Sequence, residues 1–206
     1  EATTITQHTD YPWRGDVLLT VSPASPKEFS LCLRVPKWSP SFQVSINHIK
    51  VETALPGDGY LRIRRRWSSG DEVLLRLDVS PATVFTDPRV TADFGRTAVR
   101  RGALIYCIES VDQADPASLT SLRLRPVRGR SAVFKESSIT IAGVPLIALL
   151  HDGVVQVGES SGGPLYGPGQ PSRARPAVLK LIPYFAWANR GAAAMRVWIP
   201  ILSGRT

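Results

Sequence analysis

Apolar and polar residues alternate with a period of two along almost the whole chain, and this alternation is the strongest constraint on its fold. It is clear in residues 29–35, 42–46 and 73–79. Successive side chains of a β-strand point to opposite faces, so this period gives a strand one apolar face. No segment of helical length repeats its apolar residues every 3.6 positions. The sequence therefore predicts an all-β fold without a helical domain.

Turn-forming residues interrupt the alternation at short intervals. Residues 57–59 (Gly-Asp-Gly) and 68–71 (Ser-Ser-Gly-Asp) are two of these turns. Strands of about five to eight residues separated by such turns are typical of β-sandwiches. The composition changes shortly after Pro88. We therefore predict two β-sandwich (jelly-roll-like) units in tandem, covering residues 1–88 and 94–206.

The second predicted unit contains a stretch rich in Gly, Pro and Ser at residues 158–176. A segment of this composition has too few apolar side chains to pack a core, so we predict a long loop there. The apolar run at 103–108 is predicted to be a strand of the same unit.

Charge and hydropathy restrict the classes of partner. Basic and acidic residues balance over residues 1–93, so the whole net charge of +8 comes from residues 94–206. The excess consists mostly of scattered arginines, which makes nucleic acid or another polyanion a weak candidate partner. No run approaches the roughly 18 apolar residues of a membrane span, and no signal peptide is expected. The cellular compartment stays undetermined.

The residue types that carry catalysis or bind metals are few and dispersed. The three histidines lie far apart, and no Cys-x-x-Cys or His-x-x-x-His is present, so we expect no metal site and no cofactor in this chain. Cys32 and Cys107 lie in apolar strands, where small buried side chains are expected more often than a disulfide. Asp93, Glu109 and Asp112 are close enough in sequence to suggest paired carboxylates, but acidic residues near β-turns are usually solvated. We predict no catalytic residue.

Aromatic residues concentrate near the C-terminus, between Leu181 and Pro200. Five residues of this stretch are singled out. Trp187 and Trp198 are predicted to pack in a structural corner, whose turn Asn189 and Arg190 help to hold. Tyr184 and Arg190 are the candidates for contact with a carbohydrate or a protein partner, because aromatic rings stack on sugars and guanidinium groups bind hydroxyl oxygens.

The order of short motifs along the chain resembles one known family. The motifs are Thr6–Gly15, Leu33–Trp38, Gly59–Ile63, Trp67–Asp71, Gly95–Ala98, Arg101–Glu109, Ile182–Gly191 and Met195–Pro200. In this order they resemble the C-terminal region of the β-L-arabinofuranosidase family, glycoside hydrolase family 127. The chain departs from the family pattern at three turns, where it has Asn47-His48, Ala103 and Ala192–Ala194.

The resemblance implies a longer protein than these 206 residues. Family members have an (α/α)6 helical barrel followed by β-sandwich domains, and the barrel carries a zinc-bound cysteine nucleophile with further cysteines and a glutamate. Those residues precede the motif at 9–13, so the resemblance implies that this chain lacks the barrel and its zinc. Neither Cys32 nor Cys107 matches a zinc ligand of the family.

Two functions follow from these observations. The first is a non-catalytic accessory region that supports the missing helical catalytic domain of its own protein and forms a homodimer interface. The second is an autonomous carbohydrate-binding module, suggested by the number of tryptophans.

Overall fold

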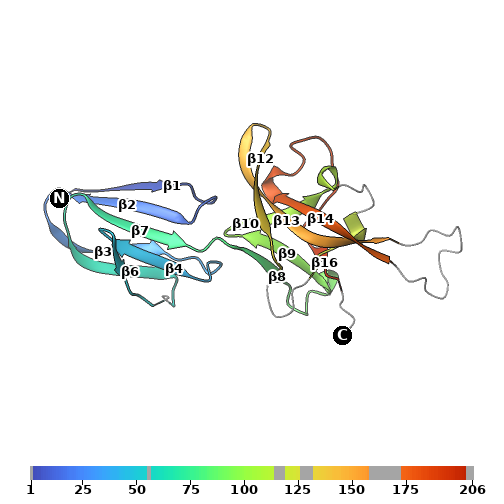
Figure 1. Ribbon diagram of the computed structural model, residues 1–206. Coiled ribbons are helices and arrows are strands. Elements are labelled where there is room, and N and C mark those ends of the chain that lie inside the picture. Colours follow the sequence, from blue (N-terminus) through green and yellow to red (C-terminus); the bar gives the residue numbers. More distant parts are fainter. Residues whose placement is uncertain (1, 55–56, 114–118, 126–131, 158–172, 203–206) are drawn as a thin grey trace, which may run out of the picture. The chain divides into compact units, whose positions relative to one another are not determined.

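The structure is a computed structural model that describes residues 2–54, 57–113, 119–125, 132–157 and 173–202. Within these ranges the chain forms β-strands and four short 3-10 helices, so the predicted all-β fold is confirmed. The chain divides into two compact units, Glu1–Ser80 and Pro81–Thr206 (Figure 1). Among the described residues, none of the helices has the length and apolar character needed to cross a bilayer.

The division between the units falls earlier in the chain than the predicted boundary at 88–94. Strand β8 (Pro81–Phe85) pairs with β9 (Arg96–Arg101), so it belongs to the second unit. The predicted first unit ended at Pro88 and therefore included the residues of β8. Alternation along a strand identifies the strand and its apolar face, but it does not identify the neighbour with which the strand pairs.

The first unit consists of two facing sheets. The larger sheet has the strand order β1-β2-β7-β4-β5, and the smaller sheet contains β3 and β6 (Figure 1). The bounds are β1 Thr3–Thr9, β2 Asp16–Pro23, β3 Lys27–Arg34, β4 Phe42–Ile46, β5 Ile49–Val51, β6 Tyr60–Trp67 and β7 Asp71–Leu77. All pairs within these sheets are antiparallel.

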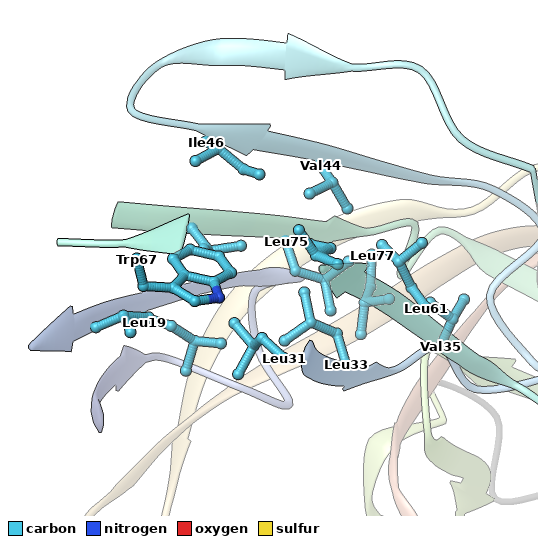
Figure 2. Close-up of a cluster of buried hydrophobic side chains, with 13 residues drawn as sticks. Leu19, Leu31, Leu33, Val35, Val44, Ile46, Leu61, Trp67, Leu75 and Leu77 are labelled. Atoms are coloured by element: carbon cyan, nitrogen blue, oxygen red, sulfur yellow. The ribbon is translucent and has the colours of Figure 1, made fainter. Parts of the chain in front are cut away.

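Apolar side chains from both sheets meet in one core. Figure 2 shows Leu19 of β2, Leu33 of β3 and Trp67 of β6 within this cluster. Trp67 is fully buried, and its indole N–H donates to the carbonyl oxygen of Phe29 across the β3–β6 pair at 3.0 Å. Cys32, which was predicted to be buried, points to the opposite face of β3 and is exposed. The alternation within β3 puts Leu31 and Leu33 inward and therefore Cys32 outward.

Two turns of the first unit are held by one carboxylate. Asn47 adopts a left-handed conformation (φ 48°) and donates from its side-chain amide to Asp71 at 2.8 Å. The backbone N–H of Ser68 donates to the other oxygen of Asp71, also at 2.8 Å. These hydrogen bonds lower the pKa of Asp71, with the Asn47 amide as the largest cause. The 68–71 turn is thereby tied to the 47–48 hairpin.

The second unit is one sheet that curls until its ends meet. Its main path is β11-β13-β14-β10-β9-β16, with β8, β12 and β15 attached along it (Figure 1). The bounds not yet given are β10 Leu104–Glu109, β11 Leu122–Arg123, β12 Lys135–Ile141, β13 Val144–Val157, β14 Arg173–Pro183, β15 Met195–Arg196 and β16 Ile199–Pro200.

Backbone hydrogen bonds at the ends of β11 and β16 join the two ends of the sheet. Leu124 N–H donates to Pro200 O at 2.9 Å, and Leu202 N–H donates to Leu124 O at 2.8 Å. The inward faces enclose a second core, which includes Tyr106, Leu149 and Leu181. Most of the predicted loop at 158–176 lies outside the described residues, and its end from Arg173 onward is part of β14.

Candidate functional site

The aromatic stretch singled out from the sequence forms a corner at the end of β14. After Pro183 the chain makes a 3-10 turn (Tyr184–Ala186) and then reverses direction through Ala188 and Gly191, which both have positive φ. Asn189 donates a long side-chain hydrogen bond to the Phe185 carbonyl at 3.4 Å. We call the segment 184–191 the corner.

A cluster of charged groups fastens the corner to the end of β10. The Arg190 guanidinium donates to Glu109 and to both oxygens of Asp112, with 2.8 Å between Nη1 and Asp112 Oδ1. Lys180 Nζ donates to the same Asp112 Oδ1 at 2.8 Å, and the backbone N–H of Ala188 donates to Glu109 Oε1 at 3.1 Å. The cluster therefore joins β10, β14 and the corner.

The two carboxylates of the cluster are almost completely removed from solvent. The side chain of Glu109 is fully buried, and that of Asp112 is 5% exposed. Burial is the largest single influence on the pKa of Asp112 and raises it, but hydrogen bonds from Arg190 and Lys180 outweigh it and the net pKa lies below the usual range. Hydrogen bonding to Asp112 is the main reason that the pKa of Arg190 is raised. The Asp112 carboxylate and the Arg190 guanidinium are thus both ionised at neutral pH.

The interpretation of Glu109 and Asp112 as solvated turn residues was wrong. They are instead buried partners of two cations, while Asp93, the third acidic residue considered, pairs with Arg96 at 3.7 Å. Their oxygens accept hydrogen bonds from Arg190, Lys180 and the backbone N–H of Ala188. The cluster therefore links the corner to the end of β10.

The aromatic side chains of the corner are more exposed than the sequence predicted. Trp187, predicted to pack in the corner, is 38% exposed, and its indole N–H donates to Ala193 O at 2.9 Å. Its ring stacks on that of Tyr184 with 6.3 Å between the ring centroids and 13° between the planes. Phe185 is 56% exposed. Trp198 is half-buried near the start of β16.

The two predicted contact residues therefore differ in availability. Tyr184 is 45% exposed and presents an aromatic surface together with Trp187. The side chain of Arg190 is 28% exposed, but its donors are committed to Glu109 and Asp112. Arg190 was chosen as a contact residue because a guanidinium group can bind hydroxyl oxygens. Its pairing was missed because Glu109 and Asp112 are about eighty positions away along the chain.

The two cysteines lie in different units and in opposite surroundings. Cys107 is buried, and burial is the main cause that raises its pKa to about 12, so it is a neutral thiol at physiological pH. Cys32 is exposed on the first unit. Within the parts of the chain that the structure describes, no group of three or more His, Cys, Asp or Glu residues is arranged to hold a metal ion.

Two domain families match the chain, one for each unit. Residues 1–79 match the GH127 middle domain of beta-L-arabinofuranosidase, and residues 81–200 match the glycoside hydrolase family 127 C-terminal domain. The boundary between the two matches coincides with the division between the units. Together the fold and these matches define the class of the chain as paired all-β accessory domains of a glycoside hydrolase.

Individual proteins of the family are similar over nearly the whole chain. A non-reducing end beta-L-arabinofuranosidase of Bifidobacterium longum subsp. longum is 35% identical over 95% of this chain and 30% of its own length. The solved structure of a GH127 beta-L-arabinofuranosidase from Geobacillus stearothermophilus T6 has a TM-score of 0.88 at 35% identity, over 97% of this chain and 31% of that one. Another, a GH127 beta-arabinofuranosidase, has a TM-score of 0.81 at 32% identity, over 96% of this chain and 31% of that one.

The chain belongs to glycoside hydrolase family 127. It spans about a third of the length of the relatives that it matches.

Proposed function

We propose that this chain is the non-catalytic accessory region of a β-L-arabinofuranosidase-like glycoside hydrolase and supports the catalytic part of its own polypeptide. The main observation is that its buried charged groups are satisfied within the fold. The carboxylate oxygens of Glu109 and Asp112 accept hydrogen bonds from Arg190, from Lys180 and from a backbone N–H. A general acid or nucleophile needs an oxygen within hydrogen-bond reach of the substrate, which these two carboxylates do not offer.

The substrate of the whole protein is proposed from its relatives. Two of them are named for action on β-L-arabinofuranosides. The zinc-bound cysteine chemistry implied by the family resemblance is assigned to the catalytic part. The buried thiol of Cys107 is neutral, whereas a zinc ligand is a thiolate.

The proposal is tested by assaying this chain and the longer protein on a synthetic aryl β-L-arabinofuranoside. We expect turnover by the longer protein and none by the 206-residue chain. Removal of residues 1–206 from the longer protein should lower its Tm or its solubility. Turnover by this chain alone at about 1 s⁻¹, a typical enzymatic rate, would contradict the proposal. So would a catalytic part whose Tm and activity are unchanged without the region.

A second candidate function, carbohydrate binding, is favoured by the stacked rings of Tyr184 and Trp187. Flat aromatic surfaces at a protein surface suit the apolar faces of sugar rings. The first unit offers an internal control, since Tyr11 and Trp38 also stack with 6.3 Å between their ring centroids.

Titration with arabinose oligosaccharides, followed by tryptophan fluorescence, tests this second candidate. If the corner binds sugar, Trp187→Ala abolishes the fluorescence change and Trp38→Ala leaves it intact. A response that is absent, or equal in both variants, would exclude the corner as a sugar-binding surface.

A further inference from the structure

The first unit has a groove that the proposed support function does not explain. The groove has a volume of about 640 Å³ and lies between the larger sheet and strand β3 of the smaller one. Its floor includes Val17, Leu19 and Leu75, which belong to the core-facing side of the larger sheet. Leu31 and Leu33 of β3 form its opposite wall. The groove is therefore an open side of the sandwich core.

Strand β1 lies under this opening with its inward face uncovered. Ile5 is paired with Val21, and Gln7 is paired with Leu19. Directly paired residues of antiparallel strands project on the same face, so Ile5 and Gln7 continue the face on which Val21 and Leu19 are buried. Every residue of β1 is nevertheless exposed, including Ile5 at 46%. Within the described residues, the smaller sheet consists of β3 and β6 alone, and the exposure of Ile5 shows that it does not cover β1.

The edge of β3 that borders the groove has unpaired backbone groups. Val35 N–H donates to Gly59 O at 2.8 Å, in register with the β3–β6 pair. Hydrogen-bonded residues alternate along an antiparallel pair, so Leu31 and Leu33 direct their backbone groups toward β6. Ser30 and Cys32 direct theirs away from β6, as does Arg34. Within the described part of the chain, no strand pairs with that edge.

We propose that an extended segment from the remainder of the longer protein binds in this groove as a third strand beside β3. Neighbouring strands lie about 4.8 Å apart and facing sheets about 10 Å apart, so a strand beside β3 would cover β1. It would accept and donate hydrogen bonds at Ser30, Cys32 and Arg34 and place alternate apolar side chains over Ile5 and Leu19. This inference rests on the proposed function, since the relatives are about three times as long as this chain.

We propose one segment rather than a second copy as the occupant, because the relatives continue over about two thirds of their length outside the region that matches this chain.

Amide hydrogen exchange, measured on this chain and on the longer protein, tests the inference. We expect the amides of Ser30, Cys32 and Arg34 to exchange at least about tenfold more slowly in the longer protein. Arg62 and Arg64 of β6 direct their amides to the opposite edge of the same sheet, by the same alternation, and should exchange equally in both proteins. Equal exchange at β3 would overturn the inference. The accessory function would then still stand if removal of residues 1–206 lowered the Tm of the catalytic part.

Variants of the longer protein test whether a segment bound in the groove causes the slower amide exchange in β3. Ser30→Pro removes an outward N–H without touching the β3–β6 hydrogen bonds, and Arg64→Pro is its matched control on the other edge. Ile5→Lys places a charge on the groove floor and leaves the hydrogen bonds of the β1–β2 and β3–β6 pairs intact. It therefore tests the groove even if the proline variant unfolds β3. Ser30→Pro and Ile5→Lys should return exchange at Cys32 to the rate of this chain alone, and Arg64→Pro should not.

Two results would contradict the proposed occupant. The first is protection of Cys32 that survives both groove variants. The second is protection that appears in this chain alone as its concentration rises, together with a doubled mass in sedimentation, since that would make a second copy the occupant.

Discussion

The two units of this chain treat the edges of their sheets in opposite ways. In the second unit the ends of the sheet meet through hydrogen bonds from Leu124 to Pro200 of β16 and from Leu202 to Leu124. In the first unit the sheet of β3 and β6 leaves β1 uncovered, and a groove opens into the core. The strand path of the second unit thus returns on itself, whereas the first unit has a place for one more strand. Similar strand patterns in sequence can therefore produce one sheet whose ends pair with each other and another that leaves an edge unpaired.

The largest expected effect is the loss of the buried tryptophan of the first unit. Trp67 is fully buried, contacts both sheets through the core and donates a hydrogen bond to Phe29 O. Trp67→Ala should lower the free energy of unfolding of the first unit by about 4 kcal/mol, through lost burial and the cavity left behind. Urea denaturation followed by circular dichroism measures this loss. A loss below about 1 kcal/mol would show that the stability of the first unit does not depend on the packing of Trp67.

The next effect concerns the ionic cluster that closes the corner of the second unit. Arg190→Leu leaves Glu109 and Asp112 with uncompensated buried charge and should cost about 3 kcal/mol. Arg64→Leu is the matched control, because its pair with Glu28 in the first unit is exposed on both sides and should contribute less than about 1 kcal/mol. Equal losses in the two variants, measured by urea denaturation, would contradict the structural role of the cluster.

Acid should weaken the same cluster. The pKa of Asp112 is lowered in the folded protein, so its carboxylate contributes stability above the ordinary aspartate pKa of about 3.9, and this contribution is lost as pH falls through the lowered value. Asp112→Asn should therefore be less stable than the parent chain at pH 7 by about 1–3 kcal/mol, with a difference that shrinks below about pH 4. Thermal unfolding between pH 3 and pH 7 measures the difference. A difference independent of pH would rule out this contribution of the charge.

The smallest expected effect is that of the exposed tryptophan. Trp187 stacks on Tyr184 and donates to Ala193 O, but 38% of it is exposed. Trp187→Ala should change the free energy of unfolding by less than about 1 kcal/mol, in contrast to Trp67→Ala. A loss comparable with that of Trp67→Ala would mean that the corner is core, as the sequence had suggested, rather than surface.

Predictions from sequence succeeded where a single strand carries the signal. The alternation in β3 and β7 identified strands whose apolar residues are buried. Strand β1 was not anticipated, because its inward residues are a mixture of Thr, Ile and Gln and the described chain does not cover them. Trp187 was expected in the core because large aromatic residues are usually buried, but its position after the 3-10 turn directs it outward.

The candidate site shows the same limit. Tyr184 and Arg190 were selected by residue type, which says what a side chain is able to bind but not what already occupies it. Arg190 meets Glu109 and Asp112 only because β10 and β14 are paired and the corner folds back over the end of β10. No local pattern reports a contact between residues so far apart along the chain.

The sequence by itself determined that this protein is all-β, that it contains two units and that it resembles family 127. Strand periodicity, turn residues and motif order are properties of the amino-acid sequence, so they can be recognised without the tertiary structure. Only the tertiary structure decided which unit takes β8, that one sheet closes while the other stays open, and that the corner carboxylates are buried. These features depend on pairing between distant strands, where hydrogen bonds and burial are decided by neighbours in space rather than in sequence.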